Sequence, residues 1–88
     1  MAEKEVLDLD QLMRVTGVGV YESANRAGIA PSNWSRWRGH GVSPHMGKFA
    51  KMRGAVIDLA IEAGRLPDGS RSKSVPELID IAVRGGVV

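Results

Sequence analysis

Two short helix-length segments separated by a tight turn are the feature that most constrains the fold of this chain. Residues 20–27 and residues 31–38 flank a three-residue turn that begins at Gly28. Glycine suits the left-handed conformation that often follows the last residue of a helix. Pro31 can open a helix because its missing N–H would have no partner inside the first turn. We therefore predict a helix over 20–27, a turn, and a helix over 31–38.

The rest of the chain also has the spacing of amphipathic helices, with apolar residues recurring every three or four positions. Capping residues predict three more helix starts, at Asp8, at Ser43–Pro44 and at Ser74. Residues 67–73 combine turn and charged residues and are expected to form a turn and a solvated linker. Strand signals are weak, so the prediction is an all-α fold, a compact bundle of four to five helices.

The charged residues are distributed unevenly along the chain. The whole chain has a net charge of only +2, but residues 23–53 contain six Lys or Arg residues and no Asp or Glu. A basic segment without acids is typical of a surface that meets phosphate groups. A chance absence of acids over this length is the alternative interpretation.

The segment 31–38 has two chemically different sides when it is placed on a helical wheel. Trp34 and Trp37 fall on one side, and Ser32, Asn33 and Arg36 fall on the other. The tryptophans are expected in the core, with base stacking as the alternative. Arginine can bond guanine through two parallel hydrogen bonds, and asparagine can do the same with adenine. The outward side therefore carries groups that suit base edges or phosphates.

The turn and its second helix resemble a known motif. The run from Gly28 to Arg38 is similar to the turn and recognition helix of the lambda-repressor-like helix-turn-helix superfamily, particularly the small phage CII-type transcriptional regulators. Pro31 stands where such motifs usually carry a polar residue. The motif's core positions correspond to five residues: Ala24, Gly28, Ile29, Trp34 and Trp37. The resemblance covers roughly residues 8–62 and is concentrated in residues 20–38.

This resemblance implies a DNA-binding regulator of transcription, from a phage or a prokaryote, that acts as a homodimer or higher oligomer on double-stranded DNA. Ser32, Asn33 and Arg36 match the base-reading positions. The residues expected at the DNA backbone are Arg26, Pro31, Ser35, Arg38, His40 and Lys48. Residues 1–66 would form the helix-turn-helix domain, and residues 67–88 a turn and a helix. That last helix either covers the core or, with the apolar Val87 and Val88, mediates self-association.

Other functions are weighed against this one. The same scaffold could serve as a protein-interaction module, such as an antitoxin or a phage factor that binds a host protein, or as an accessory protein that bends DNA. Lys48, Lys51 and Arg53 are either phosphate contacts or ordinary surface charges. No nucleophile with a base and no carboxylate pair in a pocket is visible, so we expect neither an enzyme nor a cofactor.

Several further absences narrow the prediction. His40 and His45 lack the spacing of metal ligands, and Gly17–Val18–Gly19 lacks the residues of a phosphate loop. The chain contains no cysteine, which fits a reducing cytoplasm. No signal peptide or membrane span is expected.

Overall fold

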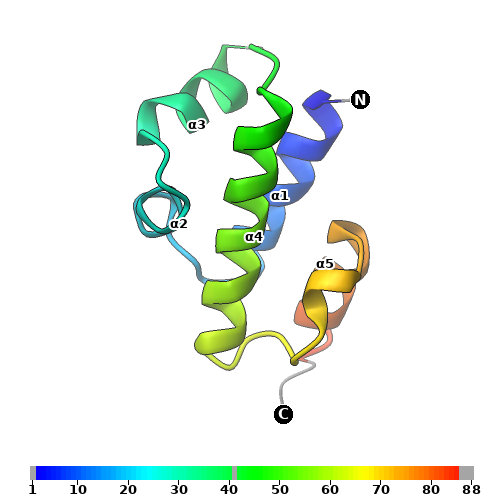
Figure 1. Ribbon diagram of the computed structural model, residues 1–88. Coiled ribbons are helices and arrows are strands. Elements are labelled where there is room, and N and C mark those ends of the chain that lie inside the picture. Colours follow the sequence, from blue (N-terminus) through cyan, green and yellow to red (C-terminus); the bar gives the residue numbers. More distant parts are fainter. Residues whose placement is uncertain (1, 41, 86–88) are drawn as a thin grey trace.

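The computed structural model describes residues 2–40 and 42–85, and in these ranges it contains helices and no strands. The elements are α1 (Ala2–Thr16), α2 (Val20–Ala27), α3 (Pro31–Gly39), α4 (Met46–Glu62), the 3₁₀ turn η1 (Ser70–Ser72) and α5 (Val75–Val83) (Figure 1). The predicted all-α class with four to five helices is confirmed.

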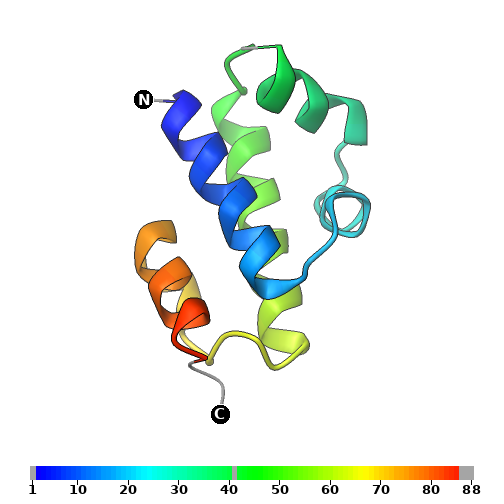
Figure 2. The same ribbon diagram turned by 180° about the vertical axis from the view of Figure 1, so that it is seen from behind.

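The helices surround one hydrophobic core. Both views show α1 and α4 side by side, with α2 and α3 to one side of them and α5 to the other (Figures 1 and 2). The most extensive packing is between α2 and α4 and between α1 and α5. The largest side chains without any exposed surface come from α1, α4 and α5, namely Leu9, Leu12, Met52, Ile57 and Leu78. The core is therefore built by all three of these helices.

Helix α1 begins at Ala2, so the predicted start at Asp8 is wrong. Val6 is 2 % exposed, which extends the buried stripe of α1 by almost one turn before Leu9. Helix α5 packs along α1 and gives these extra turns an apolar surface to cover. Burial against a distant segment thus outweighs the local capping signal at Asp8, which lies inside the helix.

Helix α4 begins at Met46, two residues later than the start predicted from Ser43–Pro44. The backbone of His45 is extended, and its carbonyl accepts the first helical hydrogen bond from the Phe49 N–H at 2.9 Å. Residues 42–45 are outside any helix because they carry the chain from the end of α3 to the start of α4 (Figure 1).

Residues 67–73 form a mostly exposed segment, in keeping with the predicted turn and solvated linker, but Ser70 is buried and α4 contacts the segment. Ser70 is fully buried, and its hydroxyl donates to the Pro67 carbonyl at 2.6 Å. Arg53 on α4 donates to the Lys73 carbonyl at 2.7 Å, so its guanidinium holds this segment against α4. A predicted cap is confirmed at the next element, where Ser74 and Glu77 form a capping box at the start of α5.

Helix α5 covers part of the core. Val75 and Leu78 lie in the same buried cluster as residues of α1 and α4. Val83 points outward, and Val87 and Val88 lie outside the described residues. Self-association through this end of the chain therefore stays a prediction.

Candidate nucleic-acid interface

The turn between α2 and α3 has the predicted conformation. Gly28 has φ +73°, the left-handed region that strongly favours glycine. The Gly28 N–H donates to the Asn25 carbonyl, and the Ile29 N–H donates to the Ala24 carbonyl at 2.9 Å. Ala24 and Ile29 are buried, as expected for the inside of this turn. Figure 1 shows α2 end-on and α3 lengthwise, so the two helices cross steeply.

Two indole rings fasten α3 to the body of the molecule. Trp34 is 4 % exposed and Trp37 is 7 % exposed, which confirms the predicted core role and leaves neither ring available to stack on a base. Their ring centroids are 6.2 Å apart in an edge-on arrangement. The Trp37 ring lies a further 6.2 Å from the ring of Phe49 on α4. Such aromatic contacts add directional packing to the burial of apolar area.

The opposite side of α3 carries the predicted base-reading residues. Ser32, Ser35 and Arg36 are exposed, and Asn33 is half-buried. Within the described ranges, the Arg36 guanidinium has no carboxylate within ion-pair distance. The backbone of α3 begins at Pro31, as predicted. The outer face of α3 thus carries short polar side chains and the positive charge of Arg36.

The arginines predicted at the DNA backbone are held by carboxylates of the chain itself. Arg26 donates two hydrogen bonds to one oxygen of Glu62, at the far end of α4. The Arg38 Nε lies 3.1 Å from an Asp10 oxygen on α1. Both arginines remain partly exposed, but each would have to leave its partner before contacting a phosphate.

The other backbone candidates are placed differently. His40 follows α3 directly, and Lys48 lies in the first turn of α4; both are exposed. Pro31 and Ser35 lie along α3 itself. Within the described ranges, Lys48 has no ion-pair partner. Among the predicted contact residues, the cations without an ion-pair partner in the described ranges are therefore Arg36 on α3 and Lys48 on α4.

Asp10 is a site residue that the sequence did not identify. Its side chain is 17 % exposed and forms ion pairs with Arg14, one turn away on α1, and with Arg38 at the end of α3. The spacing of four residues between Asp10 and Arg14 is a recognisable helical ion pair. The contact with Arg38 could not be read from the sequence because the two residues meet only through the packing of α1 against α3.

Tyr21 is a second residue that was not predicted. It is 72 % exposed on the first turn of α2 and borders a hollow that Pro31, Ser32 and Ser35 also line. A phenol hydroxyl beside the start of α3 is a suitable donor to a phosphate. Its only signal in the sequence was its place just before the turn motif.

The described residues contain no cluster of three or more side chains suited to hold a metal ion. Among the same residues, no helix combines the length and the apolar character needed to cross a bilayer. Comparisons of the chain with family models, with curated proteins and with solved structures gave no match.

Proposed function

We propose that this protein binds double-stranded DNA by placing α3 in the major groove, and that it regulates transcription in this way. The observation that carries the proposal is the division of α3 into two sides: two buried indoles face the core, and an acid-free polar surface faces outward. A helix needed only for solubility would be expected to carry acids as well as bases outward. The resemblance to the lambda-repressor-like superfamily supports the same function.

The dimensions of α3 suit this role. An α-helix with its side chains is about 10–12 Å across, and the major groove is about 12 Å wide. The steep crossing of α2 and α3 leaves the outer side of α3 clear of the neighbouring helix (Figure 1). A short helix held at one side by large rings can thus enter the groove without disturbing the core.

Each exposed group on α3 has a chemical role in this proposal. Arg36 reads guanine through O6 and N7, and Asn33 pairs with adenine or holds a phosphate. Ser32 lies near the helix N-terminus, where free amides also attract a phosphate. Tyr21 precedes α3 in the sequence and Lys48 follows it. In this proposal, both residues contact the DNA backbone beside the groove.

We further propose that two copies act together on two half-sites. A symmetric dimer can place one α3 in each half of a symmetric DNA site. Analytical ultracentrifugation with and without the selected DNA measures the stoichiometry. A single copy on a DNA site without repeated halves would contradict this part of the proposal alone.

Selection from random duplex DNA, followed by binding assays on the selected site, tests the function. Arg36→Ala should lower the preference for the selected sequence by about 1–3 kcal/mol, which is the value of a bidentate base contact. The matched control is Lys48→Ala, which removes a cation beyond α3 and should weaken selected and random DNA equally. Both variants alter exposed side chains, so neither should unfold the protein.

Two results would count against the proposal. One is that no sequence is enriched and that binding to random duplex does not depend on salt. Each phosphate contact should lower log affinity by about 0.9 per log unit of salt. That result favours the protein-interaction module. The other is full sequence preference in Arg36→Ala, which would move base reading away from α3.

A further inference from the structure

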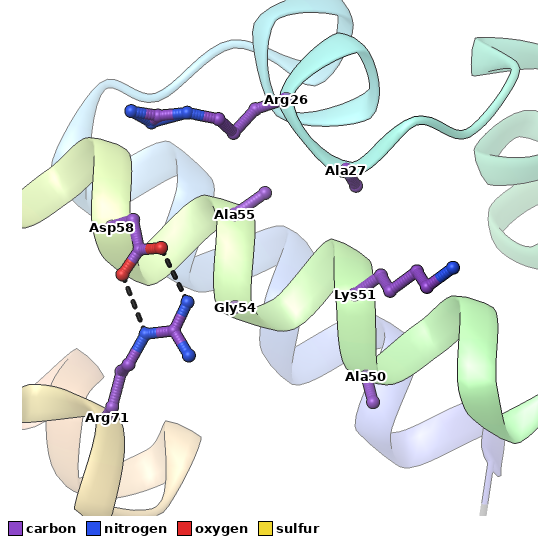
Figure 3. A pocket seen from close by; sticks show the side chains of 8 residues that line it. All are labelled: Arg26, Ala27, Ala50, Lys51, Gly54, Ala55, Asp58 and Arg71. Atoms are coloured by element: carbon purple, nitrogen blue, oxygen red, sulfur yellow. Dashed lines mark hydrogen bonds and ion pairs between the residues drawn. The ribbon is translucent and has the colours of Figure 1, made fainter.

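A shallow cavity of about 410 Å³ lies on a different face of the molecule, between α2, α4 and η1 (Figure 3). We call it the α2–α4 trough. Its floor consists of small residues, namely Ala27, Ala50, Gly54 and Ala55. None of its lining residues belongs to α3, so the trough is separate from the proposed base-reading residues, although Arg26 is also one of the residues predicted at the DNA backbone.

Three positively charged side chains surround this floor, each from a different element. They are Arg26 on α2, Lys51 on α4 and Arg71 on η1, and Asp58 is the one carboxylate among the lining residues. Figure 3 shows Arg26 and Lys51 toward opposite ends of the floor and Arg71 along its lower edge. Positive charge therefore borders the trough on three sides.

Arg71 is held in place by two features of α4. Its Nε and Nη2 donate to the two oxygens of Asp58, at 2.7 Å and 2.5 Å (Figure 3). The absence of a side chain at Gly54 leaves room for the guanidinium, since a Cβ there would lie 3.3 Å from the Arg71 Nη2. Glycine inside a helix is otherwise unfavourable, so this close approach gives it a structural reason.

The pKa of Asp58 is affected by two of the arginines that border the trough. The hydrogen bond from Arg71 lowers the pKa of the Asp58 carboxyl below its usual value. The charges of Arg71 and of Arg26 lower it further, while burial opposes them. Arg26 thus acts on the same site as Arg71, although the two residues come from different elements.

The cations of the trough retain capacity for another anion. Arg26 pairs with Glu62 and would have to leave this partner to bind an anion, which has a modest free-energy cost because the pair is partly exposed. Lys51 is exposed and has no ion-pair partner among the described residues. The Arg71 Nη1 makes no hydrogen bond there either. The two carboxylates therefore do not neutralise the site.

We propose that the α2–α4 trough binds the phosphate chain of a small ligand that carries at least two linked phosphates. Arg26 and Lys51 lie toward opposite ends of the floor, so a chain of linked phosphates along the floor can approach more than one cation (Figure 3). Guanidinium groups bind phosphate through paired hydrogen bonds, and a floor of alanine and glycine admits a narrow ligand close to α4. This inference does not depend on the proposed DNA binding, because its ligand is a free phosphate chain.

Titration of the full chain with phosphate, pyrophosphate and tripolyphosphate at constant ionic strength tests the proposal by amide chemical shifts. The amides of Ala27, Gly54 and Ala55 should shift and saturate. Tripolyphosphate should bind roughly tenfold more tightly than phosphate, the effect of one added charged hydrogen bond. Lys51→Ala should remove most of this gain. The matched control is Lys48→Ala, one turn earlier on the same helix and outside the trough.

Three results would overturn the proposal. Equal affinity for the three anions would mean that the added phosphates contact no further cation of the trough. Tight binding that survives Lys51→Ala would place the site elsewhere. A short DNA duplex that shifts the trough amides and displaces tripolyphosphate would identify the phosphate source as the DNA backbone instead of a small ligand.

Discussion

The ion pair between Asp10 and Arg38 gives the most discriminating prediction for the proposed DNA binding. The Asp10 carboxylate binds Arg14 at 3.3 Å and Arg38 at 3.1 Å, and its side chain is only 17 % exposed. Asp10→Asn keeps the shape of the residue but removes the charge that both arginines share. The Arg38 guanidinium would then be free at the end of α3.

The expected size of the effect follows from one additional phosphate contact. If Arg38 joins the DNA backbone, the slope of log affinity against log salt becomes steeper by about 0.9. Between 50 and 200 mM salt, this added contact weakens binding by about 3.5-fold more than in the unaltered protein. The lost ion pairs are partly exposed and cost up to about 1 kcal/mol of folding free energy.

Fluorescence-anisotropy titration on random duplex DNA at several salt concentrations measures this slope. Arg38→Ala alone should change it little, because Asp10 already holds the side chain. In the Asp10→Asn background, Arg38→Ala should return the slope to its original value. Asp8→Asn is the matched control, since it removes a carboxylate of the same helix that forms no ion pair among the described residues. If Arg38→Ala flattens the slope equally in both backgrounds, Asp10 does not restrain Arg38 and the reasoning fails.

Two further predictions concern stability, both measured by urea denaturation. Trp37→Ala should lower the free energy of unfolding by about 3–5 kcal/mol, because it removes a buried ring that contacts rings on α3 and α4. The control Val83→Ala, at an exposed site, should change it by no more than about 0.5 kcal/mol. Similar costs for the two variants would show that Trp37 does not anchor α3. Arg71 holds the pKa of Asp58 below its usual value, so the stabilisation is complete above the unfolded-state pKa of about 4 and disappears as pH falls through the lower folded-state value. Asp58→Asn should therefore be less stable than the unaltered protein at pH 7, and the difference should shrink in acid; a constant difference down to pH 2 would contradict this.

Much of the fold could be predicted because its signals are local. The bounds of α2, the left-handed Gly28, the start of α3 at Pro31 and the cap at Ser74 are all confirmed. Each of them depends on backbone preferences and hydrogen bonds within a few residues. The burial of Trp34 was also predictable, because helical periodicity alone separates the two sides of a short helix.

The errors in the predicted helix bounds have a different cause. Helix α1 starts at Ala2 because Val6 finds a buried place that depends on the packing of α5 against α1. In the predicted linker 71–73, Arg53 of α4 donates to the Lys73 carbonyl and Asp58 of α4 accepts from the Arg71 side chain, and the sequence did not indicate either contact. Such contacts join residues far apart in the chain, so no short sequence window contains them.

The sequence alone determined which side of α3 is apolar and which side carries Ser32, Asn33 and Arg36, because that division follows from helical periodicity. Tertiary structure decided which cations remain available. Arg26 and Arg38 meet Glu62 and Asp10 only when separate helices pack together, since ion pairs between distant residues depend on the three-dimensional arrangement of the chain.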